Sequence, residues 1–129
     1  MRLLTFAPSH FSEKARWALD RSGLAYTEER HTPLLHRIAL LRVKAGRSVP
    51  ALVLPGRVLK DSPSILQFAD EHLPRERRLY PDEPELRRLV QDYERKVGKE
   101  IGLSVPRWAY FYLLSRKDLM LQLFLPGVG

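Results

Sequence analysis

Residues 48–66 read SVPALVLPGRVLKDSPSIL and contain the strongest local signals of the chain. The run 48–54 is apolar and typical of a buried strand. Pro55-Gly56 predicts a tight turn, and the strand expected over 57–60 is short enough to close a hairpin. The next four residues, 61–64, are a strong helix start, because an acid and a hydroxyl stand at the cap and proline in the first turn. The stretch therefore predicts two antiparallel strands followed by a helix that ends at Pro74.

The segment before this stretch alternates between strand and helix signals. Residues 2–6 are rich in strand formers, and a helical stretch over 10–22 ends at Gly23, as a left-handed C-terminal glycine would end it. A second strand is expected over 25–31, and a helix is expected to begin at Thr32-Pro33 and end near Gly46. The order β-α-β-α-β-β-α predicts an α/β fold whose first crossover joins parallel strands.

The chain changes character after Pro74. Residues 75–82 are expected to form a linker, since Pro74, Pro81 and a run of arginines replace the apolar periodicity. Residues 83–101 have the pattern of a charged amphipathic helix, and Pro106 is expected to separate it from a second helix over 107–123. The expected organisation is a domain over 1–74, a linker over 75–82 and an all-α segment over 83–129.

The sequence contains no cysteine. A disulfide, a thiolate metal site and a cysteine nucleophile are therefore excluded, so any thiol chemistry must use the thiol of a ligand. The histidines share no helical face and no metal-ligand spacing, and no metal site is expected. No apolar run approaches the roughly 20 residues that a membrane-spanning helix needs. With no signal-peptide pattern either, we expect a cytoplasmic protein without a membrane partner.

The net charge of +7 raises the question of nucleic-acid binding. Residues 1–73 contain 11 basic and 7 acidic side chains, and residues 74–129 contain 11 and 8, so both halves share the excess. No nucleic-acid signature accompanies this charge. A solvated surface is therefore favoured, and no nucleic-acid partner is expected.

Two helix starts are candidates for ligand binding, because ligands of open α/β sheets gather where strands end and helices begin. Ser9 and Ser12 lie at the first helix start, where free N–H groups and the helix dipole favour an anion, including a thiolate. Asp61 and Ser62 complement the ammonium and carboxylate of an amino-acid head group. At both places the alternative is a helix cap with no further role.

The third candidate is Val49-Pro50 at the start of the apolar strand. Proline at this position frees the backbone groups of Val49 from the strand ladder, so that they can pair with a peptide-like ligand. On the residues alone, a trans Val49–Pro50 bond is expected, since only about 5 to 6% of such bonds are cis.

Together these loci resemble the glutathione S-transferase family. Residues 8–16, PSHFSEKAR, are similar to the family's active-site segment, and residues 48–52, SVPAL, resemble its Val-Pro-x-Leu strand start, in which the proline is cis. Residues 61–65, DSPSI, resemble its Glu/Asp-Ser-x-x-Ile helix. The resemblance covers residues 1–74 and implies a thioredoxin-like, glutathione-binding domain, followed by an all-α domain of which residues 83–129 form a part.

The resemblance also implies roles for single residues. Ser9, with Ser12 as the alternative, would stabilise the glutathione thiolate. The cysteinyl backbone would be held by Val49 and Pro50, and the γ-glutamyl group by Asp61 and Ser62. Candidates for the glycine carboxylate are His36 and Arg47.

The implied reaction is attack of the thiolate on an electrophilic small molecule, with glutathione as co-substrate and no metal. A hydroxyl in place of cysteine argues against thiol transfer through a mixed disulfide. The resemblance further implies a detoxifying enzyme that forms a homodimer. The alternative is a non-catalytic binding module that keeps the same fold.

Overall fold

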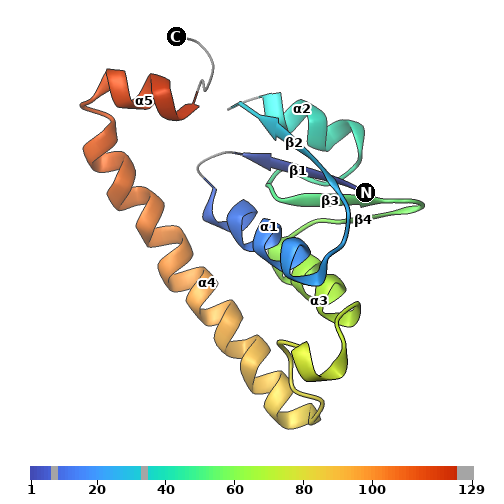
Figure 1. Cartoon of the computed structure of the whole chain (residues 1–129). Helices are drawn as coiled ribbons and strands as arrows, with labels where there is room; N and C mark the ends of the chain where they lie inside the picture. The colour runs from blue at the N-terminus through green and yellow to red at the C-terminus, as the bar shows by residue number, and fades with distance from the viewer. Residues whose placement is uncertain (7–8, 33–34, 125–129) are drawn as a thin grey trace. The chain divides into compact units, whose positions relative to one another are not determined.

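The computed structural model describes residues 1–6, 9–32 and 35–124 (Figure 1). The chain divides into two compact units, Met1–Pro81 and Asp82–Gly129. The first unit combines strands and helices, and the described part of the second unit is helical. Over the described residues, no helix is both long and apolar enough to cross a membrane.

The first unit is built on a four-stranded sheet with the strand order β2-β1-β3-β4. Its elements are β1 (Arg2–Phe6), α1 (His10–Ser22), β2 (Thr27–His31), α2 (Leu35–Arg42), β3 (Ala51–Leu54), β4 (Arg57–Leu59) and α3 (Ser62–Glu71). β1 pairs with β2 in parallel, while the β1–β3 and β3–β4 pairs are antiparallel. The α/β order and the mixed sheet expected from the sequence are thus confirmed.

Helices cover both faces of this sheet: α1 and α3 lie on one face and α2 on the other (Figure 1). Successive residues of β1 point to opposite faces. Leu4 packs with Leu40 of α2 and with Ala51 of β3. Leu3 and Thr5 are also fully buried, and they point toward the face that carries α1. The central strand therefore supplies both layers of the core.

Helix α1 has the limits that the sequence predicts. Gly23 adopts a left-handed conformation with φ 70°, and its N–H donates to the carbonyl of Asp20 at 3.1 Å. The buried face contains small and aliphatic residues together with one hydroxyl, and these are Ser12, Ala15, Ala18 and Leu19. Small side chains at this face allow the helix to lie close to the sheet.

Other element limits differ from those expected. β2 begins at Thr27 rather than at residue 25, and β3 begins at Ala51 because Pro50 has no N–H to donate to a strand ladder. α2 ends at Arg42 rather than near Gly46, since Lys44 already adopts a positive φ of 55°. Pro33, part of the expected helix start, lies outside the described residues.

The segment expected to be a linker packs against the first unit. It contains a 3-10 turn, η1 (Arg75–Arg77), and Tyr80 is only 3% exposed. Arg21 and Arg77 each donate from the guanidinium to the other's backbone carbonyl, at 3.1 and 3.2 Å. The N–H of Leu79 donates to the buried carboxylate of Asp70. Contacts therefore group residues up to Pro81 with the sheet.

In the second unit, the predicted break at Pro106 is wrong. A single helix, α4 (Pro84–Leu113), runs through Pro106, and a short helix, α5 (Lys117–Phe124), follows it. Pro106 has no N–H, so the carbonyl of Gly102, four residues earlier, lacks its helical hydrogen bond. An internal proline costs a helix about 3 kcal/mol. Proline keeps a helical φ, however, so a helix with several turns on each side can continue through it.

We expect Asp70→Ala to destabilise the chain by about 2 kcal/mol, because it leaves the Leu79 N–H without its charged acceptor. Urea unfolding followed by circular dichroism measures this loss. The matched control is Glu71→Ala at the exposed neighbouring position, which should change the free energy of unfolding by less than about 0.5 kcal/mol. Equal stability of the two variants would contradict this role of Asp70.

Candidate functional site

A cavity of about 200 Å³ in the first unit brings together two of the sequence-predicted loci. Its lining comes from α1, from the segment before β3 and from the start of α3, and consists of Phe11, Ser48, Val49, Pro50, Lys60, Asp61, Ser62 and Pro63. All four residues of the Val49-Pro50 and Asp61-Ser62 pairs are included. Residues about twelve positions apart in the chain therefore share one small site.

At the α3 end of the cavity, Asp61 caps the helix. Its Oδ1 accepts the N–H of Ser64 at 2.8 Å, and its carbonyl accepts the N–H of Ile65 at 3.2 Å. Pro63 has no N–H, so the remaining amide donor of this first turn is that of Ser62, for which the helix offers no partner. Asp61 is exposed and Ser62 is buried. An exposed carboxylate thus stands beside a hydroxyl and an amide donor at the positive end of a helix dipole.

Just before β3, the Val49–Pro50 peptide bond is cis. This is the isomer that the family resemblance implies, and the trans bond expected from the residues alone is wrong. Pairing of β3 with β1 begins at Ala51, so the backbone groups of Val49 lie before the paired strand. The Val49 side chain packs against the core cluster that contains Leu4 and Leu40. The core therefore anchors Val49 beside the cavity.

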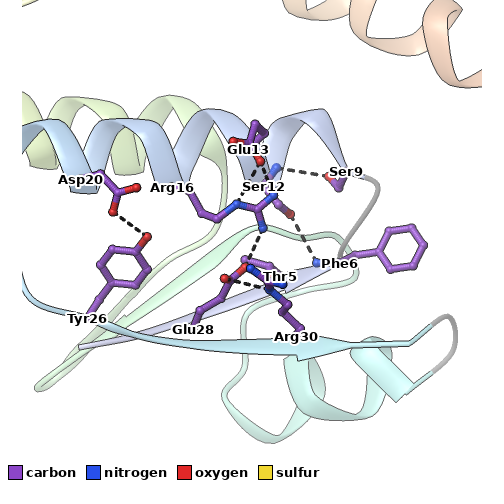
Figure 2. A network of polar contacts seen from close by, with 10 residues as sticks. All are labelled: Thr5, Phe6, Ser9, Ser12, Glu13, Arg16, Asp20, Tyr26, Glu28 and Arg30. Carbon is purple, nitrogen blue, oxygen red and sulfur yellow. Dashed lines mark hydrogen bonds and ion pairs between the residues drawn. The ribbon is translucent and has the colours of Figure 1, made fainter. Parts of the chain in front are cut away.

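The two serines of α1 have different environments. Ser9 is half-buried and is the N-cap, and its Oγ accepts the N–H of Ser12 at 3.2 Å (Figure 2). Ser12 is fully buried, and its Oγ accepts the N–H of Phe6 at 3.4 Å. Ser9 is thus the more accessible of the two hydroxyls, whereas Ser12 holds the helix to β1. Ser9 does not line the cavity itself, but Phe11 of the same helix does.

Behind Ser9, an ionic network ties α1 to the sheet (Figure 2). Glu28 of β2 accepts hydrogen bonds on Oε1 from the Thr5 hydroxyl at 2.7 Å and from Arg16 at 2.6 Å. Arg30 donates to the other oxygen of Glu28 at 3.0 Å. Arg16 also pairs with Glu13 of its own helix. The Glu28 and Arg16 side chains are 16% and 15% exposed, so this is a largely desolvated ion pair.

The network shifts the titration of its members. Burial opposes ionisation of Glu28, but hydrogen bonds from Thr5, Arg16 and Arg30 outweigh it and lower the pKa of the carboxyl. Burial likewise opposes the charge of Arg16, and its carboxylate partners raise the pKa above the ordinary value. Tyr26, which follows α1, donates a hydrogen bond from its hydroxyl to Asp20 at 2.9 Å, and burial together with this bond raises the pKa of Tyr26 to about 12. Both ions of the central pair therefore stay charged at neutral pH.

The remaining candidates lie outside this cavity. His36 stacks on Phe6 with ring centroids 5.9 Å apart. Arg47 lines a different hollow, together with Arg37, Leu41 and Gly46. Neither residue contributes to the lining shared by Val49 and Asp61. Within the described part of the chain, no group of three His, Asp or Glu residues is placed to hold a metal ion.

Phe11 and Lys60 line the cavity but were not among the residues chosen from the sequence. Lys60 is exposed and directly precedes Asp61, so the cavity carries one cation and one anion side by side. Its position next to a predicted site residue was the available signal for Lys60. Phe11 lies on the expected apolar face of α1 and gave no signal beyond core packing.

Comparison with known proteins agrees with the fold. The first unit is a thioredoxin-like domain of the kind that begins glutathione S-transferases. Residues 3–77 match the family described as glutathione S-transferase, N-terminal domain, and the chain belongs to this family. Among curated protein sequences, none matches this chain.

Solved structures give the same fold at low sequence identity. A Tau-class glutathione S-transferase from mango superposes with a TM-score of 0.67 at 20% identity, over 77% of this chain and 46% of that one. The bacterial enzyme BphK, in a ternary complex, gives 0.64 at 24% identity, over 78% and 52%. A Sulfitobacter glutathione transferase homologue with bound glutathione gives 0.63 at 19% identity, over 75% and 48%. The matched part thus spans about half the length of these structures.

We expect Glu28→Gln to lower the free energy of unfolding at pH 7 by about 2 kcal/mol, since Arg16 loses its buried partner. The native pKa of Glu28 lies below its ordinary value of 4.5. Its stabilising effect is therefore complete above that pH and is lost as the pH falls through the lower native value. Urea unfolding of both proteins between pH 7 and about pH 3 should show the difference shrinking. A difference that stays constant over this range would contradict the assignment.

Proposed function

We propose that the first unit binds glutathione in the cavity between Val49-Pro50 and Asp61-Ser62 and activates its thiol for conjugation to an electrophilic small molecule. The observation that carries this proposal is the meeting of a cis proline and a capped helix start in one cavity of a glutathione S-transferase family chain.

The chemistry of the lining matches the chemistry of glutathione. The exposed Asp61 carboxylate suits the γ-glutamyl ammonium, and the hydroxyl and N–H of Ser62 suit its carboxylate. Backbone groups of Val49, outside the strand ladder, suit the cysteinyl peptide. Lys60 adds a cation that suits a carboxylate of the tripeptide. None of the predicted site residues that line this cavity is a cation.

Activation of the thiol is assigned to Ser9. As the helix cap, Ser9 Oγ accepts the N–H of Ser12 with one lone pair. The hydroxyl proton of Ser9 is a separate donor that can point to a thiolate sulfur. The N-terminal end of α1 adds the positive end of a helix dipole, which lowers the pKa of a thiol placed there. Ser9 would stabilise the thiolate, and the thiolate would then attack the electrophile.

A second candidate function is a non-catalytic interaction module, and the observation that favours it lies on α4. The helix exposes a group of aromatic side chains near its C-terminal end, in which Trp108 is 68% exposed and Phe111 is 75% exposed. Exposed apolar clusters of this kind mark binding surfaces. A chain that binds glutathione without conjugating it would favour this second function.

The binding step is tested with Asp61→Asn in the full chain. Asparagine caps helices as well as aspartate, so α3 should keep its stability while the charge for the ammonium is lost. Calorimetric titration with glutathione should give a Kd raised at least about tenfold. The control is Glu71→Gln at the other end of α3, which should leave the Kd unchanged. Absence of binding heat from the folded wild-type chain would overturn the proposed function.

The role of Ser9 is tested with Ser9→Ala against Ser9→Thr, which keeps both the hydroxyl and the cap. Loss of the donor should raise the pKa of the bound thiol by about 1 to 2, as followed by thiolate absorbance against pH. Conjugation of an activated chloroaromatic electrophile at neutral pH should fall at least about tenfold in the alanine variant only. An unchanged rate in Ser9→Ala would remove Ser9 from the mechanism.

A further inference from the structure

The positive charge of the first unit is concentrated in one segment. Residues 32–60 contain no Asp or Glu. The same segment contains six Lys and Arg side chains, which are Arg37, Arg42, Lys44, Arg47, Arg57 and Lys60. The even division of charge between the two halves of the chain conceals this cluster. The segment folds as α2 and the β3–β4 hairpin, and we call its solvent-exposed surface the basic face.

Within the described residues, some cations elsewhere in the chain are held in ion pairs, whereas those of the basic face are not. Arg2 pairs with Glu29, and Arg116 pairs with Asp118. Over residues 1–6, 9–32 and 35–124, no Asp or Glu forms an ion pair with any of the six cations of the basic face. One of them, Arg57, lies over the ring of Phe68 at 5.4 Å. Lys60 also lines the cavity assigned to glutathione, so the charges that this surface offers to a different anion are those of Arg37, Arg42, Lys44, Arg47 and Arg57.

The basic face is hollowed, and apolar side chains lie beside the cations. One hollow of about 350 Å³ is lined by Arg37, Leu41, Gly46 and Arg47. A second, of about 450 Å³, lies between the end of α2 and the hairpin, and its lining consists of Val43, Lys44, Val53, Leu54, Gly56, Arg57, Val58 and Lys60. On the outer side of α2, Ile38 is 50% exposed and Leu41 is 66% exposed. Each hollow thus combines apolar surface with at least two cations.

We infer that the basic face binds an acidic, amphipathic segment of a partner polypeptide. Its carboxylates would pair with cations such as Arg37 and Lys44, and its apolar side chains would enter the two hollows. Charge complementarity would accelerate association and select acidic partners, and burial of apolar area would slow dissociation. No glutathione is needed for this interaction.

Other anionic partners fit the surface less well. A phosphate backbone offers nothing apolar to cover Ile38 and Leu41. A bilayer surface presents no projecting side chains to fill two separate hollows. A polypeptide supplies both carboxylates and projecting apolar groups along one segment. The hollows are therefore the feature that selects a peptide over a membrane or a nucleic acid.

The test uses the full chain and a fluorescein-labelled synthetic peptide whose Leu and Glu residues are spaced as an amphipathic helix. Fluorescence anisotropy should show saturable binding, weakened at least about tenfold by Arg37→Glu with Lys44→Glu. Leu41→Ser keeps the charge and should weaken binding about fivefold or more. A peptide of the same composition with scrambled order should bind at least about tenfold more weakly.

The matched control places the same change of charge on α4, as Arg88→Glu with Lys99→Glu, and should alter the Kd by less than about twofold. An equal loss in this control would show that net charge alone attracts the peptide, and would overturn the inference. Tighter binding of phosphatidylserine vesicles or of a single-stranded DNA oligonucleotide through Arg37 and Lys44 would also overturn it. If the variant Arg37→Glu with Lys44→Glu does not fold, the neutral variant Arg37→Gln with Lys44→Gln is used in its place.

The two proposals are separated by reciprocal titrations. The Arg37→Glu, Lys44→Glu variant should bind glutathione as the wild-type chain does, because neither residue lines the glutathione cavity. Asp61→Asn should bind the peptide as the wild-type chain does. A failure of glutathione binding in the wild-type chain would leave the peptide result unaffected, and parallel losses in both variants would contradict the separation of the two sites.

Discussion

The carboxylate of Glu28 joins three elements of the first unit. A hydroxyl from β1 and a guanidinium from α1 donate to one of its oxygens, and Arg30 of its own strand donates to the other. A largely buried charge needs all of these partners, because each missing donor would leave it poorly solvated. Helix α1 therefore cannot rotate or slide on the sheet without losing a bond to Glu28. The position of Ser9, at the start of that helix, follows from this constraint.

The two helix starts predicted to bind a ligand use the same local geometry. Ser9 and Asp61 both have extended backbone, and each accepts the N–H of the residue three positions on. In both cases the capping hydrogen bond leaves one polar atom of the side chain available. In Ser9 this is the hydroxyl proton, and in Asp61 it is the second carboxylate oxygen. Structural and ligand-binding roles are therefore compatible, and a substitution such as Asp61→Asn can separate them.

Much of the first unit was predictable because its signals are local. Apolar periodicity, Gly23 and the capped start at Asp61 each act within a few residues, and the observed elements follow them. The difference between Ser9 and Ser12 was not local: both stand at the helix start, and only the folded structure shows that Ser12 is buried and accepts the N–H of Phe6.

The failures have similar causes. Phe11 belongs to the cavity through tertiary packing, which no spacing encodes, whereas Lys60 stands next to the predicted residue Asp61. At Pro106 the local preference of proline to end a helix is outweighed by the long helical stretch around it, which continues from Pro84 to Leu113. The cis Val49–Pro50 bond was accessible only through the family resemblance, since the residues alone favour trans.

The sheet has two open edges, and both are poor templates for further strands. β2 carries the charged sequence TEERH, and β4 is only three residues long and is flanked by Lys60. A strand added at β2 would have to place its backbone beside charged side chains. A strand added at β4 would find very few hydrogen-bonding partners. Edge-to-edge pairing of first units is therefore disfavoured, even though α2 exposes the apolar side chains of Ile38 and Leu41.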